Sequence, residues 1–373
     1  MHYTDIVGQA EAKERLIKMV NTNRVPHALL FSGKDGYGHL LTAITFAQHL
    51  LCKNKTKTEA CGVCPTCNKV SKLIHPDLHF VFPIIKSKSV KTSNNLLPEF
   101  RDAFLQNPYL TLNDWVEELN AENKQPIIPV EESEDVLKKL SYTSFEGSYK
   151  IMIIWHADRM NIEAANKLLK VLEEPTDNTI FILIAPDTER LMATIISRVQ
   201  HIPFYQVDEK EIISALINQH QVSEESAKQA AFLSDGNFRE ALSTFQKGDE
   251  GISFLTHFQN FMRVALKFDC NKALEWVDEN ASNDREKQKQ FITYSLAVFR
   301  DALMFNFGEK SLVRLSGNER QFLEKFAPFV NQKNYQALAE EFNSTYYYIE
   351  RNANPKILFM DLLLKTNEFI NLK

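Results

Sequence analysis

The fold is decided by residues 27–40, which read HALLFSGKDGYGHL. The apolar run at 27–32 predicts a short buried strand, and the helical spacing of 40–51 predicts a helix directly after the glycine-rich loop. Gly33 and Gly38 have the spacing of a phosphate-binding loop, whose pattern is G-x-x-x-x-G-K-[ST]. These residues therefore predict an α/β domain with a loop of the phosphate-binding type between strand and helix.

The loop lacks the residues that would bind nucleotide. His39 stands where the pattern has its lysine, and Leu40 stands where it has the hydroxyl that holds Mg²⁺. Lys34 lies five positions too early to replace the missing lysine. Taken alone, the loop is also typical of a plain glycine turn between a strand and a helix, and that interpretation stays open at this point.

Two further apolar runs predict strands at 150–155 and 179–184, and a helix between them ends at Glu174-Pro175. Near-continuous apolar strands separated by helices indicate a parallel sheet that is covered on both faces. From about residue 207 onward the pattern is helical only. Residues 84–128 contain a polar, loop-like run, and we interpret them as an insertion on the surface of the sheet domain.

The ends of these strands also lack ATPase chemistry. The strand at 150–155 runs into Trp155-His156-Ala157-Asp158, where an ATPase would carry Asp-Glu to hold the metal and orient water. Asp158 is a residual candidate, three residues past the expected position. The strand at 179–184 ends in Ala185-Pro186, where a polar residue would sense the γ-phosphate. Together with the loop, three positions indicate an ATPase fold without activity.

Four of the five cysteines lie close together, at Cys52, Cys61, Cys64 and Cys67, and Cys270 stands alone. Tetrahedral Zn²⁺ prefers four soft ligands, and a C-x2-C turn presents two of them to one ion. The spacing therefore predicts a structural zinc site with no open position for water. A redox dithiol is the competing interpretation, but it needs only two cysteines.

Composition limits the class of protein further. The chain of 373 residues is 44% apolar and 24% charged, as expected for an ordinary globular protein of two or three domains. A net charge of −5 excludes a free-standing, strongly basic DNA-binding domain. No apolar run is long enough to cross a membrane, and the N-terminus does not resemble a secretion signal. We therefore expect a cytoplasmic protein.

Several stretches carry a family resemblance: LKVLEEP at 169–175, FILI at 181–184 and TIISRVQ at 194–200, with VGQ at 7–9 and VPHALLF at 25–31. They closely resemble the bacterial clamp-loader family of AAA+ proteins. The resemblance covers about 1–83 and 129–245. It implies an AAA+ P-loop-type parallel sheet domain that is followed by helical parts.

Within that family, motor subunits keep a complete P-loop and a Ser-Arg-Cys motif, and one non-motor subunit keeps the zinc cysteines and this motif without binding ATP. The present chain is similar to the latter. The resemblance implies that Arg198, after Ser197, is an arginine finger offered in trans to ATP on a neighbouring motor subunit. Val199 stands at the usual cysteine. A solvated surface arginine is the alternative for Arg198.

The resemblance also implies a domain organisation: an AAA+ domain at 1–206 with a zinc module at 52–67 and the insertion at about 84–128, a helical lid at 207–246, and a C-terminal helical collar at 247–373. The stretch DGNFREAL at 235–242 resembles the sensor-2 region of the lid. Without a nucleotide to reach, Arg239 in it is expected to have a structural role.

By resemblance, the chain is an ATPase-inactive subunit of the clamp loader of the DNA polymerase III holoenzyme, not an enzyme on its own. The implied partners are gamma/tau-type motor subunits and the clamp-opening delta subunit, with the sliding clamp and primer–template DNA reached through the complex and no membrane. Zn²⁺ is the only cofactor expected, and no ATP. Two alternatives stay open: a motor subunit with a degenerate but working P-loop, and a non-enzymatic zinc adaptor.

Overall fold

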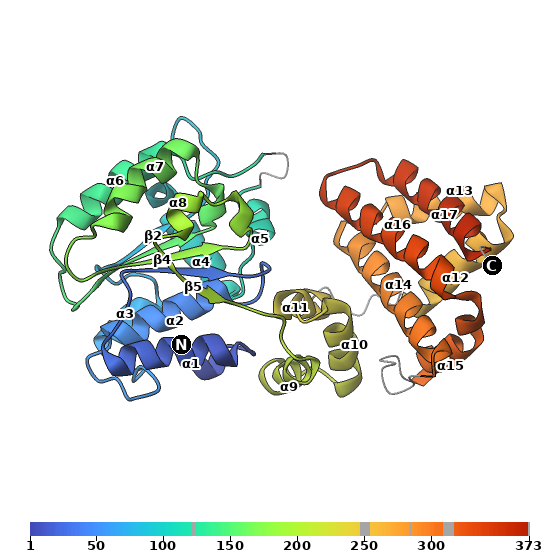
Figure 1. Cartoon of the computed structure of the whole chain (residues 1–373), viewed down its shortest axis with the longest axis horizontal. Helices are drawn as coiled ribbons and strands as arrows, with labels where there is room; N and C mark the ends of the chain where they lie inside the picture. Colours follow the sequence, from blue (N-terminus) through green and yellow to red (C-terminus); the bar gives the residue numbers. More distant parts are fainter. Residues whose placement is uncertain (121–123, 247–253, 284, 309–316, 372–373) are drawn as a thin grey trace. The chain divides into compact units, whose positions relative to one another are not determined.

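The computed structural model describes residues 1–120, 124–246, 254–283, 285–308 and 317–371. The chain divides into two compact units, Met1–Gln246 and Lys247–Lys373. The first unit holds the sheet and the helices around it, and the second holds helices (Figure 1). The further boundary expected near residue 206 stays a prediction.

All strands of the first unit run parallel in one five-stranded sheet with the order β2-β3-β4-β1-β5. The central strand β1 is the one that precedes the glycine-rich loop, and it pairs with β4 on one side and β5 on the other. The strands are β1 (Ala28–Ser32), β2 (Leu78–Val81), β3 (Lys150–Trp155), β4 (Thr179–Ala185) and β5 (Gln200–Pro203). The predicted fold class, a parallel α/β domain followed by helices, is confirmed.

Helices cover both faces of this sheet (Figure 1). Alternate strand residues enter two separate cores: Leu29 and Phe31 of β1 belong to the one that includes α1 and α2, and Leu30 belongs to the one that includes α6 and α7. Every residue of β1, β3 and β4 is buried, which is why their sequences are nearly all apolar instead of alternating between apolar and polar residues.

The helices of the first unit fall into three groups. The first group precedes β2 in the chain: α1 (Ala10–Thr22), α2 (His39–Leu51) and α3 (Pro65–Ser71). The second group lies between β2 and β5 in the chain: α4 (Leu97–Gln106), α5 (Leu112–Glu118), α6 (Val130–Ser141), α7 (Ile162–Glu173) and α8 (Ala193–Ile196). The third comes after the sheet: α9 (Glu209–His220), α10 (Glu224–Ser234) and α11 (Phe238–Gln246). Short 3₁₀ turns lie at η1 (Tyr3–Asp5), η2 (Ser93–Leu96), η3 (Ala157–Arg159) and η4 (Thr188–Arg190).

The expectation that residues 84–128 form a surface insertion is wrong for much of this stretch; residues 121–123 lie outside the described ones. Phe100, Phe104 and Trp115 are fully buried in the core of the first unit. Phe100 stacks on Phe82 with ring centroids 4.1 Å apart, and the indole N–H of Trp115 donates to the Pro83 carbonyl at 2.8 Å. The polar run at 86–95 is loop-like as predicted, but the aromatic side chains after it bury α4 and α5 against the sheet.

The second unit consists of helices in its described part: α12 (Phe254–Lys267), α13 (Cys270–Ala281), α14 (Arg285–Asn306), α15 (Gly317–Phe326), η6 (Ala327–Phe329), α16 (Gln332–Glu350) and α17 (Pro355–Ile370). Its core is aromatic. Phe258 makes edge contacts with Phe299 and Phe326, at centroid distances of 5.5 and 5.4 Å, and Phe261 packs on Trp276 at 5.0 Å. The phenylalanines thus supply the bulk that this helical unit needs to exclude water.

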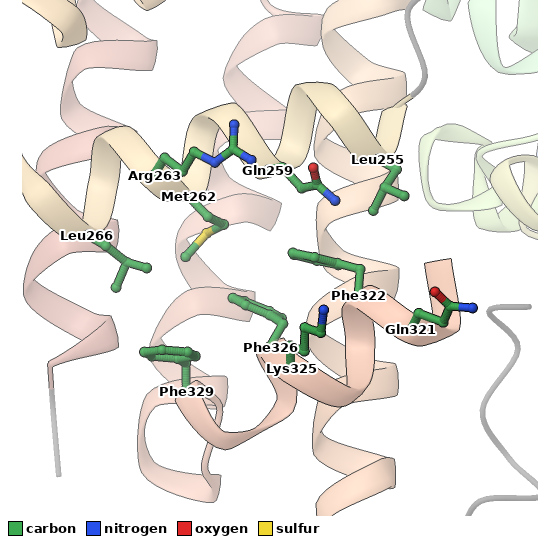
Figure 2. A pocket seen from close by; sticks show the side chains of 10 residues that line it. All are labelled: Leu255, Gln259, Met262, Arg263, Leu266, Gln321, Phe322, Lys325, Phe326 and Phe329. Carbon is green, nitrogen blue, oxygen red and sulfur yellow. The ribbon is translucent and has the colours of Figure 1, made fainter. Parts of the chain in front are cut away.

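A groove of about 470 Å³ lies between α12 and the α15–η6 segment (Figure 2). Its walls are mostly apolar and aromatic, and two cations, Arg263 and Lys325, are part of its lining. The apolar lining residues are Leu255, Met262, Leu266, Phe322, Phe326 and Phe329. Separately, none of the described helices combines the length with the apolar character that membrane crossing requires.

Candidate functional site

The glycine-rich loop connects β1 to α2 at the carboxyl edge of the sheet, the edge where α/β domains bind ligands. Gly36 and Gly38 have φ of 90° and 87°, in the region that L-residues rarely adopt. A side chain at Gly36 would also run into the side chain of Asn237, the residue before α11. The loop therefore keeps a glycine-dependent shape, but its close neighbours are protein atoms.

His39 and Leu40, at the lysine and hydroxyl positions of the pattern, are both buried. The His39 ring packs on Phe204 with centroids 4.5 Å apart. Burial lowers the pKa of His39 to about 4, although Asp35 opposes this shift, so the imidazole is neutral at pH 7. Lys34 forms an ion pair with Glu240 at 3.2 Å. His39 thus supplies no positive charge to a phosphate, and Lys34 is engaged elsewhere.

A buried cluster of charges lies beside the loop, at the end of β3. His156 has a left-handed backbone conformation, and its Nε2 lies 3.3 Å from Oδ2 of Asp35 while its Nδ1 lies 3.5 Å from Oδ1 of Asp158. Burial alone would lower the pKa of His156, but the two carboxylates outweigh it and raise that pKa to about 9. Asp35 and Asp158 therefore face an imidazolium in the position where an ATPase would present acids to Mg²⁺.

Residues 107–115 fill the space next to the loop, and we call them the filling segment. Tyr109 contacts the loop at Gly38, where an added Cβ would lie only 2.9 Å from the ring, and it meets Phe238 of α11 at a centroid distance of 4.8 Å. Its hydroxyl accepts a hydrogen bond from the Val7 N–H at 2.8 Å. The Leu112 N–H donates to Asp35 Oδ2 at 2.8 Å.

The cavity that remains beside the loop measures about 10 Å³. That volume corresponds to about one water molecule. It is lined by Asp35, Gly36, Gly38, His39, Leu40, Pro108, Tyr109, Leu110 and Trp155.

Arg239 of α11, expected to be structural, is part of an ion pair, which confirms that expectation. Its Nη2 and Nε donate to the two carboxylate oxygens of Asp114 at 2.6 and 2.9 Å. The same carboxylate accepts from the N–H and hydroxyl of Thr111, which begins α5. Arg239 therefore binds the filling segment, 125 residues earlier in the chain.

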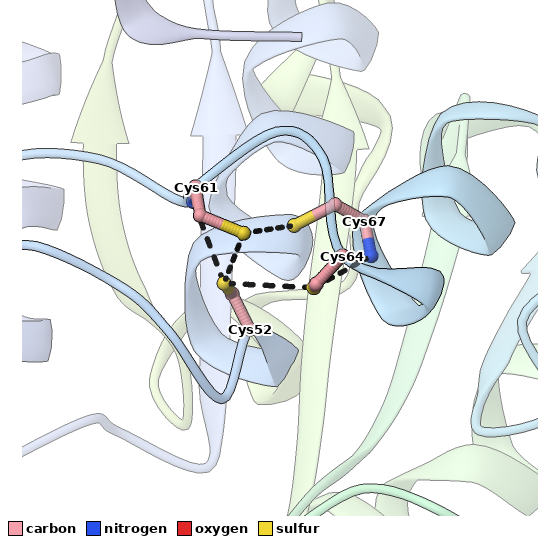
Figure 3. A group of neighbouring side chains, drawn as sticks. All are labelled: Cys52, Cys61, Cys64 and Cys67. Atoms are coloured by element: carbon pink, nitrogen blue, oxygen red, sulfur yellow. Dashed lines mark hydrogen bonds between the residues drawn. The ribbon is translucent and has the colours of Figure 1, made fainter.

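The four cysteines come together as the spacing predicts (Figure 3). Their sulfur atoms all lie within 4.8 Å of one another, with Sγ–Sγ distances of 3.6 Å for Cys52–Cys61, 4.0 Å for Cys52–Cys64 and 3.9 Å for Cys61–Cys67. Sulfurs that bind one zinc at about 2.3 Å lie about 3.8 Å apart, so the donor set fits a tetrahedral ion.

Local structure positions these thiols. Cys52 ends α2, Cys64 caps the N-terminus of α3, and Cys67 lies in the first turn of that helix. The backbone N–H groups of Val63 and Cys64 lower the pKa of Cys61 to about 6, which favours the thiolate that binds metal. The four cysteines are free thiols with no disulfide among them.

Arg198 follows the short helix α8 and lies far from the loop in sequence. Its guanidinium donates to the Thr194 carbonyl at 2.8 Å and to the Ser197 hydroxyl at 3.1 Å, and it pairs with Glu173 at 2.6 Å. Glu173 is the last residue of α7, as the Glu-Glu-Pro sequence predicts. The Arg198 side chain is 34% exposed, so this pair lies at the surface.

The fold and this site define a class before any relative is considered: a P-loop-type α/β domain whose glycine-rich loop is packed against protein side chains. The chain belongs to the family described as DNA polymerase III, delta subunit, whose model matches residues 8–208. This match covers the whole sheet, the cysteine cluster and Arg198.

Individual relatives agree with this family. Subunit delta' of Bacillus subtilis DNA polymerase III is 33% identical over 211 residues, which cover 57% of this chain and 52% of that protein. Subunit tau of the same organism is 28% identical over 257 residues, covering 68% of this chain and 38% of that protein. Subunit delta' of Pseudomonas aeruginosa is 30% identical over 172 residues, covering 46% and 41%. The matched part spans about half the length of these relatives or less.

Among solved structures, a DNA polymerase III gamma-subunit-related protein from Thermotoga maritima aligns with 96% of this chain and 100% of that chain. The TM-score is 0.39 and the sequence identity is 14%.

Sequence reasoning missed the filling segment and the residues that it engages. The sequence assigned no role to Tyr109, Asp114 or Asp35. It identified His156 only as a residue that stands where an ATPase has an acidic side chain. The signal available in the sequence was the group of aromatic residues between 100 and 115, which is too apolar for a surface insertion.

Proposed function

We propose that this chain is an ATPase-inactive subunit of a DNA polymerase III clamp loader, and that it offers Arg198 in trans to ATP held by a neighbouring motor subunit. Membership of the DNA polymerase III delta-subunit family supports the setting. The relatives named delta' and tau support a place among clamp-loader subunits.

The observation that carries the inactive role is the filled loop. The cavity between the loop and the filling segment measures only about 10 Å³, and this supports the proposal. His39 is neutral, and Leu40 has no hydroxyl for Mg²⁺. The imidazolium of His156 sits where a metal-binding acid would be needed. A motor subunit with a working but degenerate P-loop is therefore disfavoured.

The arginine finger is supported by the position and partners of Arg198. A surface ion pair such as Arg198–Glu173 is worth about 0–1 kcal/mol, so the guanidinium can exchange Glu173 for a more highly charged partner. A γ-phosphate is such a partner, since guanidinium groups bind phosphate oxygens in a bidentate manner. In the transition state this charge lowers the barrier to phosphoryl transfer. Ser197 orients the guanidinium through its hydroxyl.

The cysteine cluster would hold a structural zinc ion. Four thiolates complete the coordination of zinc, which leaves no position for an activated water. The ion would instead tie the end of α2 to the start of α3.

In this proposal residues 1–206 form the AAA+ domain, 207–246 the lid and 247–373 a collar that assembles with other subunits. The partners would be gamma/tau-type motor subunits and the clamp-opening delta subunit, and the sliding clamp and primer–template DNA would be reached through the complex in the cytoplasm.

The inactive role is tested by nucleotide titration of the isolated chain with a fluorescent ATP analogue and Mg²⁺. We expect no saturable binding at millimolar concentrations, with a gamma/tau-type motor subunit as the positive control. Tight binding to this chain would contradict the role and favour a working P-loop.

The finger is tested by ATP hydrolysis in the reconstituted loader with clamp and primed DNA. Arg198→Ala should remove the turnover of one motor subunit, by about 10³-fold at that site, while assembly stays intact. Arg190→Ala is the matched control, because Arg190 is an exposed arginine of the neighbouring turn η4. Unchanged turnover in Arg198→Ala would show that Arg198 has only a structural role.

A further inference from the structure

The groove of the second unit has one wall on α12 and one on the α15–η6 segment (Figure 2). The α12 residues that line it follow one another at helical spacing, so they share one face of that helix: Leu255, Gln259, Met262 and Leu266. This face is about 16 Å long, since a helix rises about 1.5 Å per residue. The groove therefore has the length of about three turns of a helix.

The opposite wall is a row of three aromatic rings. Phe322 stacks on Phe326 with ring centroids 5.4 Å apart, and Phe326 stacks on Phe329 with centroids 6.2 Å apart. Phe326 is buried, but Phe329 is 47% exposed. The row therefore leaves apolar surface in contact with water, and burial of that surface against a partner would be favourable.

Two cations complete the lining of the groove, and no acidic residue is part of it. Arg263 belongs to α12 and Lys325 to α15, so each wall contributes one positive charge. The Arg263 guanidinium donates to the neutral amide oxygen of Asn260 at 3.2 Å, and no carboxylate of the described residues forms an ion pair with either cation. Glu324 is exposed beside Lys325 in the sequence but does not line the groove. The chain has a net charge of −5, so the lining has the opposite sign to the molecule as a whole.

The size of the groove favours a short segment over the face of a whole subunit. Its volume of about 470 Å³ lies within the range of about 300–1,000 Å³ for pockets that bind ligand-sized groups. Ten residues line it, whereas a stable interface between subunits uses about 20–30 residues a side. Both walls present residues three or four positions apart, which matches the side-chain ridges of a third helix.

We propose that the groove is a docking site for a short, acidic, amphipathic helix of a protein outside the clamp loader. Apolar residues of that helix, three and four positions apart, lie between α12 and the aromatic row. Its carboxylates pair with Arg263 and Lys325, and this charge complementarity selects the partner and sets its orientation. The inference goes beyond the proposed function, because it depends neither on nucleotide nor on Arg198.

Peptide selection on the full-length chain tests the chemistry of the occupant. The probe is a phage-displayed library of random peptides about 16 residues long, enough for about four helical turns. Peptides enriched on the wild type should be acidic and should carry apolar residues at spacings of three and four. The double variant Arg263→Glu, Lys325→Glu should enrich basic peptides instead. Peptides without net negative charge on the wild type, or the same peptides on both proteins, would overturn the proposal.

Fluorescence anisotropy of the most enriched peptide then locates its binding site. Lys325→Glu and Phe329→Ala should each weaken binding by about tenfold or more, the first through charge and the second through lost apolar contact. Both side chains are exposed, so both variants should fold, and circular dichroism checks this. Lys272→Glu is the matched control, because Lys272 is an exposed lysine of α13 outside the groove, and it should change the affinity by less than about twofold. Equal affinities of all these proteins would place the peptide elsewhere and overturn the proposal.

Two other occupants of the groove give different results. A second copy of this chain would appear in sedimentation velocity as a dimer that Lys325→Glu dissociates. A neighbouring subunit would displace the peptide when the loader is reconstituted around this chain, whereas an open groove keeps the peptide bound. Either a dimer or displacement would overturn the proposal. Neither result bears on the ATPase-inactive role or on Arg198, which are tested by nucleotide binding and hydrolysis.

Discussion

His156 reverses the electrostatics of the position that follows β3. An ATPase needs negative charge there to attract Mg²⁺, whereas this chain has an imidazolium between two carboxylates, Asp35 and Asp158. The pair of acids is therefore occupied by a cation that belongs to the protein. The left-handed backbone at His156, with φ of 53°, turns the ring toward both partners.

This arrangement makes stability depend on pH. The pKa of His156 is about 9 in the folded chain against 6.5 for the free group, so its stabilising effect is complete below pH 6.5 and is lost as pH rises through 9. We expect the wild type to lose about 3 kcal/mol of unfolding free energy across that range relative to His156→Asn. Asparagine tolerates the left-handed conformation. Denaturant unfolding of both proteins at several pH values measures this difference, and parallel pH profiles would contradict it.

The cysteines make a second prediction at this scale. Cys61→Ser and Cys64→Ser should each lose stoichiometric zinc and loosen the first unit, because each removes one of four soft ligands. Cys270→Ser is the matched control, since Cys270 is exposed and lies outside the cluster. Zinc content by inductively coupled plasma mass spectrometry and the unfolding temperature of each variant test this prediction. Full zinc in both cluster variants would show that the ligand assignment is wrong.

At the scale of elements, the sequence predicts those strands whose burial is complete. β1, β3 and β4 are near-continuous apolar runs, and the structure confirms all three. β2 and β5 were missed: each has only four residues, and Gln200 and His201 of β5 are exposed. Four residues are too few for a periodicity to be recognised.

The position of the filling segment could not be predicted from apolar patterns, for a different reason. Periodicity indicates which face of an element is buried, but it does not identify the residues that this face contacts. The contact between Asp114 and Arg239 joins residues 125 apart, and no local pattern encodes it. The polar run before α4 favoured a surface insertion, while the aromatic residues that follow it determine where the segment lies.

The filling segment also gives a prediction about stability. Tyr109→Phe should destabilise the first unit by about 1–3 kcal/mol, because the buried Val7 N–H loses its acceptor. Tyr109→Ala should cost about 3–5 kcal/mol through the cavity that it leaves. Tyr142→Ala, at a tyrosine that is 61% exposed, should change stability by less than about 0.5 kcal/mol. Denaturant unfolding curves measure all three, and equal effects of Tyr109→Ala and Tyr142→Ala would contradict the buried role.

For the whole molecule, the division into two compact units should determine how the chain unfolds. Each unit has its own core: aliphatic and aromatic residues pack around the sheet, and aromatic rings contact one another among the C-terminal helices. The family resemblance read from the sequence ends near residue 245, and beyond it the sequence pattern predicted only that the second unit is helical. Helical periodicity was sufficient for that, and it cannot specify which helices contact one another.

We expect the full chain to unfold in two calorimetric transitions. Phe258→Ala removes the ring at the centre of the second core and should destabilise the second unit by about 3–5 kcal/mol. The temperature of one transition should therefore fall, and that of the other should not change. Phe181→Ala, in a fully buried position of β4, should lower the other transition. A single transition that both variants shift equally would show that the two units unfold together.

The occupied loop has a consequence for reversion. Restoring lysine at His39 and a hydroxyl at Leu40 would recreate the phosphate-loop motif in the sequence, yet Tyr109 would still contact the loop at Gly38. Removing the segment would in turn take Asp114 away from Arg239 and remove one hydrogen bond from Asp35. Under the proposed function, a return to ATP binding would therefore require several changes that are each unfavourable alone. Packing around the loop would oppose such a reversal as much as the missing lysine does.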